Sequence, residues 1–237
     1  MNWSQAWIII ANLPPFFRKS KMRYRFYRVH KYVCFELSEF ERAAAKTDFL
    51  DINSCEALKE KLIGLTHLLK HHGEYEDAYI HDLLRQKNCD IQFSIEKEHK
   101  EHEKALDSLA QELEHIISVQ HNANKVHLGN EFYLSYRLFY SEMLKHLYEE
   151  EKILLPKLQA LYSDEELAKL QTKTYQKMTP DDMLGMLNVL FPHANPEDMH
   201  FFTSEMKTAE PEKFKIVWEK LLESDKKLIE QHSCRAD

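Results

Sequence analysis

Glycine is the residue that this chain most conspicuously lacks, with only 4 among 237 residues. Hairpin turns and phosphate-binding loops depend on glycine, because it adopts a positive φ at no steric cost. Its scarcity therefore argues against β-barrels, β-sandwiches, Rossmann folds and P-loop folds. Glutamate, lysine, leucine and alanine are abundant instead. This composition predicts a mostly helical protein.

Three further absences narrow the function. The four cysteines lie far apart, so there is no C-x-x-C zinc or redox motif, and the pattern favours a reducing, cytoplasmic compartment. Basic residues are not in excess, since 32 Lys and Arg stand against 39 Asp and Glu, which argues against a nucleic-acid partner. The apolar run Trp7–Ala11 is too short to span a membrane, so no membrane partner is expected.

Capping residues and proline divide the chain into three parts. Residues 1–21, interrupted by Pro14 and Pro15, are expected to be an N-terminal appendage. Residues 22–162 are predicted to form an up-down four-helix bundle. Residues 163–237 open with a capping box at Ser163 and are predicted to form additional C-terminal helices, the last of which begins near Glu210. The predicted fold class is therefore all-α.

The predicted bundle consists of four long helical segments joined by short connections. A capping box from Asn53 to Glu56 is expected to start the second segment, and residues 121–129 are expected to be a polar connection before the fourth. The apolar stripe of the second segment continues through Ile80 to Leu83. The four segments are 24–46, 53–86, 94–120 and 130–161.

Each segment carries one stripe with steps of three or four residues, and this stripe should face the bundle core. Every stripe also contains residues that are unsuited to an apolar interior. A buried carboxylate without a partner costs several kcal/mol, so such residues are usually paired or bound to a metal. The unsuited residues are His30 on the first segment, His72 and Glu76 on the second, His99 and His102 on the third, and His146 and Glu150 on the fourth.

The spacing of these residues favours a shared metal centre. In two segments a histidine precedes a glutamate by four residues, which places both on one helix face. Such a pair is often only a solvated surface pair, and a single core histidine is often structural, but coincidence on all four stripes is improbable. Imidazole and carboxylate together suit iron, manganese or zinc, and this number of ligands suits two ions. Nine further histidines, His81 among them, show no matched partner and are expected to be ordinary positions.

At these residues the sequence resembles the hemerythrin-like, or HHE cation-binding, family. The resemblance covers about residues 22–162, and it implies two non-heme iron ions as the cofactor. The implied ligands are His30, His72, Glu76, His99, His146 and Glu150, with both glutamates bridging the ions. His102 is the second candidate on its helix, as an additional ligand or as a partner of a ligand. The stretches that carry the resemblance are Tyr27-Arg-Val-His30-Lys, Leu69-Lys-His-His72-Gly-Glu-Tyr-Glu76-Asp, Glu98-His99-Lys-Glu-His102 and His146-Leu-Tyr-Glu-Glu150, the last followed by an apolar run and Pro156.

The resemblance implies a protein that binds O2 or NO for sensing, storage or the handling of iron and oxidative stress. The oxygen carriers of the family have H-x-x-x-H where this chain has His99-x-x-His102, and this difference counts against reversible oxygen carriage. One alternative is a di-iron enzyme, either peroxidase-like or repairing iron sites after nitrosative stress. Another is a helical interaction module without metal. Tyr79, Tyr136 and Tyr140 are expected to lie near the site as hydrogen-bond donors.

Overall fold

The computed structural model describes residues 23–90 and 92–236, and within these ranges the chain is helical and contains no β-strand. The all-α class is therefore as predicted, whereas the expected appendage at residues 1–21 lies outside the described residues. The larger part consists of four long helices, preceded by the 3-10 turn η1 (Tyr27–Val29). These helices are α2 (His30–Lys46), α3 (Ile52–Tyr75), α5 (Gln92–Ser118) and α6 (Asn122–Glu149).

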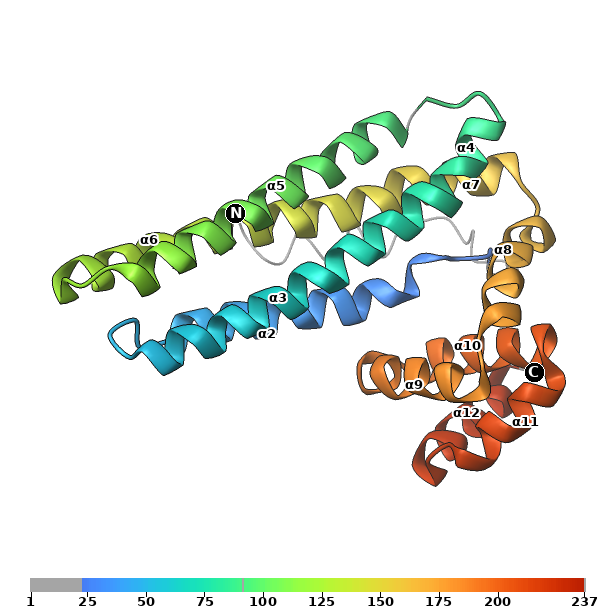
Figure 1. The fold of residues 1–237 in the computed structure, drawn as a ribbon. Helices are drawn as coiled ribbons and strands as arrows, with labels where there is room; N and C mark the ends of the chain where they lie inside the picture. The colour runs from blue at the N-terminus through green and yellow to red at the C-terminus, as the bar shows by residue number, and fades with distance from the viewer. Residues whose placement is uncertain (1–22, 91, 237) are drawn as a thin grey trace, which may run out of the picture.

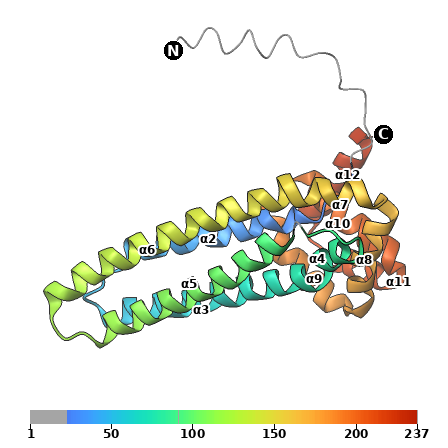
Figure 2. The same cartoon turned by 90° about the horizontal axis from the view of Figure 1, so that it is seen from above.

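The four long helices lie side by side along one axis (Figure 1, Figure 2). Helix α2 packs against α3 and α6, and α5 packs against the same two helices. Apolar side chains fill most of the interior between them, and Leu37, Leu113 and Phe132 are fully buried there. The polar residues of the predicted stripes lie together at the end where α2 begins and α3 ends.

Two helices begin at residues that differ from the prediction. The N-cap of α3 is Asp51 and not Asn53, because the Asp51 carboxylate accepts hydrogen bonds from the backbone N–H groups of Asn53 and Ser54 at 3.2 and 3.1 Å. Helix α6 begins at residue 122, so most of the predicted polar connection is helical. Gly129 lies inside this helix, and a Cβ at this position would come within 2.3 Å of the Phe49 ring. Glycine therefore lets the turn between α2 and α3 pack closely against α6.

Two π-helical turns interrupt the regular helices, and each begins at a glutamate of the predicted site. In both turns the residue that follows donates its backbone N–H to the carbonyl oxygen of that glutamate, five residues earlier. Because a π turn inserts one extra residue, the buried face moves along by one position. Leu84 is accordingly buried, whereas the regular helical period of the sequence predicts that Leu83 is the buried residue. The turns are η2 (Glu76–Ile80), which leads into α4 (His81–Gln86), and η3 (Glu150–Leu154), which leads into α7 (Leu155–Leu161).

The C-terminal residues form a further group of helices with an apolar core of their own. A capping box at Ser163 starts the first of them, as the sequence predicts, and a second capping box at Thr179 starts the next. The helix that follows Glu210 is not the last one, because it ends at Lys220 and a further helix begins at Glu223. The elements are α8 (Asp164–Lys177), α9 (Pro180–Leu190), η4 (Phe191–His193), α10 (Pro196–Ala209), α11 (Pro211–Lys220) and α12 (Glu223–Ala236).

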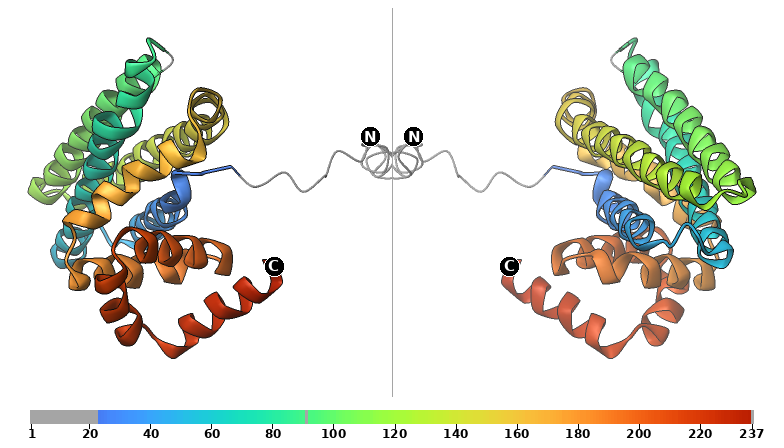
Figure 3. Two further views of the ribbon diagram at one scale, coloured as in Figure 1. Left: turned by 90° about the vertical axis from the view of Figure 1, so that its right-hand side faces the viewer. Right: turned by 90° about the vertical axis from the view of Figure 1, so that its left-hand side faces the viewer.

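The C-terminal helices pack against the chain segment around η1 and α2 (Figure 3). Arg28 is buried there and forms an ion pair with Asp198 of α10, and its guanidinium carbon lies 4.0 Å from the centre of the Phe201 ring. The Tyr24 hydroxyl donates a hydrogen bond to Glu205 at 2.5 Å. These contacts hold α10 beside the end of the long helices that carries the polar residues. Among the described helices, none has the length and apolar character needed to cross a membrane.

Candidate metal centre

The polar residues of the four stripes converge at one level of the long helices. His30 is the first residue of α2, and Glu76 and Glu150 are the first residues of the two π turns. The carboxylates of Glu76 and Glu150 are almost completely buried, with side-chain exposures of 1% and 0%. Neither carboxylate has a hydrogen-bond partner for either of its oxygens. The π turns thus place two acidic side chains in the interior, where their charge needs compensation.

One group of donor atoms comprises His30, His72 and the two glutamates. The Nε2 atom of His30 lies 3.5 Å from an oxygen of Glu76 and 3.5 Å from an oxygen of Glu150. The Nε2 atom of His72 lies 3.4 Å from Glu76. One donor atom from each of the four residues lies within 4.8 Å of the others.

A second group comprises His99, His146 and the same two glutamates. The Nε2 atom of His99 lies 3.5 Å from Glu76 and 3.7 Å from Glu150. The Nε2 atom of His146 lies 3.4 Å from Glu150 and 3.0 Å from the Nε2 atom of His99. Again one donor atom per residue lies within 4.8 Å of the others. The two groups therefore share Glu76 and Glu150, and each adds two imidazoles from different helices.

Three outer carboxylates orient three of these imidazoles. Glu151 lies 3.1 Å from the Nδ1 atom of His30, and Glu98 lies 2.9 Å from the Nδ1 atom of His146. Asp77 lies 2.9 Å from the Nδ1 atom of His99. A carboxylate at Nδ1 favours the tautomer that carries its proton there, and the lone pair of Nε2 is then free to bind a metal.

Burial and the surrounding charges shift the pKa values of the site in opposite directions. Burial lowers the pKa of His72 to about 4. Burial also opposes protonation of His30 and His99, but the carboxylates around them outweigh it and raise the pKa to about 9 for His30 and about 12 for His99. Burial and the neighbouring Glu76 raise the pKa of Glu150. The site thus concentrates negative charge that only two imidazoles offset.

The residues present fit a pair of metal ions. The unpartnered buried atoms include both oxygens of each glutamate and the Nε2 atoms of His30 and His72. Metal–nitrogen and metal–oxygen bonds of about 2.0–2.2 Å place donors on one ion about 3–4 Å apart. The separations of 3.4 to 3.7 Å between imidazole nitrogens and carboxylate oxygens lie within this span. A mixture of nitrogen and oxygen donors suits iron, manganese or zinc.

Of the seven residues predicted as ligands, the structure brings six together and leaves His102 outside the two groups. The His102 ring lies beside the centre, 4.9 Å from the His146 ring, and its Nδ1 atom is buried without a partner. Among the described residues, none of the three expected tyrosine donors forms a hydrogen bond with a candidate ligand. Tyr136 donates to the carbonyl oxygen of Leu37 in the apolar core, and Tyr79 is 42% exposed. Tyr140 packs against that core.

Several residues at the centre were not singled out from the sequence. His81, predicted to be an ordinary position, is fully buried and shares Asp77 with His99, because the π turn rotates it inward. Tyr27 packs its ring 4.7 Å from the His30 ring, and its buried hydroxyl has no partner. The outer acids had a signal in the sequence: each is adjacent in sequence to a candidate ligand, as in Glu76-Asp77 and Glu98-His99.

Comparisons of the chain with family models, with curated proteins and with solved structures found no match.

Proposed function

We propose that the chain is a non-heme di-iron protein of the hemerythrin-like kind, and that α2, α3, α5 and α6 are the up-down four-helix bundle of that family. It would bind a diatomic ligand, O2 or NO, for sensing, storage or the handling of iron and oxidative stress. The observation that carries the proposal is the pair of buried, unpartnered carboxylates shared by two groups of imidazoles. Such mixed ligation inside a helical bundle is typical of di-iron and di-manganese proteins.

The protein's own residues prepare the centre for its metal. His30 and His72 would hold one iron ion and His99 and His146 the other, with Glu76 and Glu150 between them. Iron, when bound, supplies a site for the diatomic ligand. The outer carboxylates keep the Nδ1 protons in place, so the Nε2 atoms face the glutamates.

Tyr27 is suited to donate a hydrogen bond at the centre. Burial and the carboxylates of Glu150 and Glu76 raise the pKa of its phenol, so the hydroxyl keeps its proton at neutral pH. No described side chain accepts that proton. The hydroxyl is therefore available to a ligand that enters the centre.

Titration of chelator-treated protein with iron(II) under anaerobic conditions tests the proposal, with native mass spectrometry to count bound ions. The wild-type chain is expected to bind two ions, and His146→Ala is expected to lose at least one of them. His115→Ala, on the exposed face of α5, is the matched control and should still bind two. Nitric oxide added to the iron(II) form should produce new visible absorption bands. The proposal would be contradicted if the chain bound no iron, or if neither nitric oxide nor O2 changed the spectrum of the iron(II) form.

A second candidate is a di-iron enzyme, and one observation favours it. A cavity with a volume of about 440 Å³ reaches His72 and Glu76, which leaves room for a molecule larger than a diatomic gas. Peroxide consumption by the iron form that disappears in His72→Ala would support this candidate. A stable oxidised form without turnover would count against it.

A further inference from the structure

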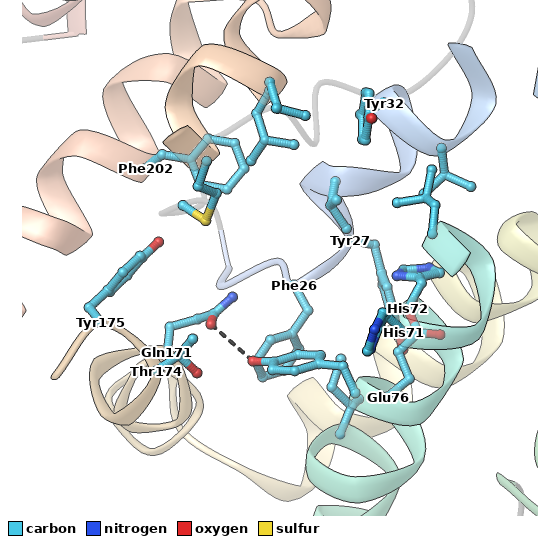
Figure 4. Close-up of a pocket in the computed structure, with 18 of the residues that line it drawn as sticks. Phe26, Tyr27, Tyr32, His71, His72, Glu76, Gln171, Thr174, Tyr175 and Phe202 are labelled. Carbon is cyan, nitrogen blue, oxygen red and sulfur yellow. Dashed lines mark hydrogen bonds and ion pairs between the residues drawn. The ribbon is translucent and has the colours of Figure 1, made fainter. Parts of the chain in front are cut away.

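The cavity beside the candidate centre lies between the long helices and the C-terminal helices (Figure 4). Its walls come from η1, α2 and α3 on one side and from α8, α9 and α10 on the other. A volume of about 440 Å³ falls within the range of about 300–1,000 Å³ that is usual for small-molecule sites. His72 and Glu76 belong to both the cavity wall and the candidate centre.

The wall of this cavity is mostly apolar and, within the described residues, contains no Lys or Arg side chain. Val33, Leu68, Met186 and Phe202 are among the apolar residues that line it. An anionic ligand would have no counter-ion here, and the carboxylate of Glu76 would repel it. A cation would lose its hydration in this mostly apolar wall, so the lining suits an uncharged and largely apolar ligand.

The side-chain amide of Gln171 is directed into the cavity. The hydroxyl of Tyr75 donates to the Oε1 atom of Gln171 at 3.0 Å, which fixes the orientation of the amide. Figure 4 shows the Gln171 amide nitrogen turned toward the space between Phe202 and Phe26. Within the described chain no residue accepts a hydrogen bond from that nitrogen. An oxygen atom of a bound molecule would satisfy it.

We propose that this cavity binds an uncharged, mainly apolar molecule that carries one hydrogen-bond-accepting oxygen, such as an alcohol, an aldehyde or a ketone. The oxygen accepts from Gln171, and the apolar body packs against the side chains of α2, α3 and α9. This binding depends on the cavity alone and does not rest on the proposed iron centre.

The probe for the experiment is prodan, an uncharged naphthyl ketone whose emission shifts to shorter wavelength in apolar surroundings. Wild-type protein is expected to bind it saturably and with this shift. 1-Decanol should displace it, whereas decanoate should compete at least tenfold less well, because the anion finds no cation in the wall. Equal competition by the alcohol and the anion would overturn the proposal.

Three variants connect the binding to this cavity. Gly185 lines the cavity, and a Cβ there meets no atom within 4 Å, so Gly185→Trp is expected to fold normally and to weaken prodan binding at least tenfold. Gly64→Trp is the matched control on an exposed position of α3, where a Cβ also meets no atom within 4 Å, and should change nothing. Gln171→Leu should weaken prodan binding about fivefold. It should leave the affinity for pyrene, which has no oxygen, within twofold of wild type.

Measurement of both the chelator-treated and the iron-loaded protein separates this proposal from the proposed function. Prodan binding by a chain that takes up no iron would uphold the cavity site and refute only the iron centre. Iron uptake without saturable prodan binding would refute the cavity site alone. Unchanged prodan affinity in Gly185→Trp, or equal losses for prodan and pyrene in Gln171→Leu, would also overturn the proposal.

Discussion

Replacement of Glu150 by methionine is expected to have opposite effects on stability with and without metal. The Glu150 side chain is 0% exposed, both of its oxygens lack hydrogen-bond partners, and its nearest imidazole nitrogens lie at 3.4 to 3.7 Å. Burial and the neighbouring Glu76 raise the pKa of Glu150, so the metal-free site disfavours the ionised carboxylate. Glu150→Met removes this unpartnered buried group and its repulsion with Glu76, and it should therefore raise the free energy of unfolding of the metal-free protein by about 1–3 kcal/mol.

With metal bound, Glu150→Met should instead be less stable than the wild-type protein. At a free metal concentration of about 1,000 times Kd, binding stabilises the wild-type protein by about 4 kcal/mol, and the variant loses most of this gain because it lacks a shared ligand. Urea unfolding in EDTA and in excess cobalt(II) measures both states, with Glu142→Gln on the exposed face of α6 as the control. If Glu150→Met were less stable than wild type in EDTA as well, the carboxylate would be a satisfied structural group and the reasoning would be refuted.

Three further changes test other parts of the structure. Asp77→Asn should lower cobalt(II) affinity about 10- to 100-fold in equilibrium dialysis, because the amide no longer fixes the Nδ1 proton of His99, and an unchanged affinity would refute this role. Burial raises the pKa of Glu205 from its ordinary 4.5 to about 7, so the folded protein holds a proton that the unfolded chain releases, and stability falls as pH rises across this window. Glu205→Gln should remove this loss, about 2 kcal/mol between pH 5 and pH 7.5, from urea unfolding, and identical pH dependence in both proteins would contradict it. Gly129→Ala should destabilise the protein by about 1–3 kcal/mol in the same assay, because the Phe49 ring occupies the position of the new methyl group. The control Gly64→Ala should not destabilise it, and equal losses in the two variants would be inconsistent with this packing.

Local sequence patterns predicted much of the helical framework, because the signals for it are short-range. Steps of three and four residues identified the buried face of α6, where Phe132, Tyr136 and Phe139 are all buried. Ser163 caps α8 as predicted, since a capping box depends on residues only three positions apart. The same patterns placed His30 and Glu76 on inner faces that the structure buries.

The predicted segments follow a regular helical period throughout and therefore do not include the π turns. A signal for them was present in the sequence. Buried residues follow one another at steps of four from His146 through Glu150 and Leu154 to Leu158. A regular α-helix would rotate such a series steadily off the core face, whereas a π turn holds it there. The first π turn likewise buries Leu84, whereas a regular helical period predicts a buried Leu83.

Long-range contacts were beyond the reach of the sequence pattern. Nothing in the spacing of Arg28 indicates that it pairs with Asp198, 170 residues away. The cavity that reaches His72 is formed where α8, α9 and α10 pack beside η1, α2 and α3, which lie far from α8 in the sequence. A helix face shows that it is apolar, but not which other element covers it.

The proposed di-iron centre is tested by the iron content and the absorption spectrum of the protein, purified aerobically after expression in iron-rich medium. We expect two iron ions per chain, held by the two groups that share Glu76 and Glu150, and oxo-iron absorption in the near-ultraviolet and visible range that dithionite bleaches. Protein without iron, and without this absorption, would contradict it.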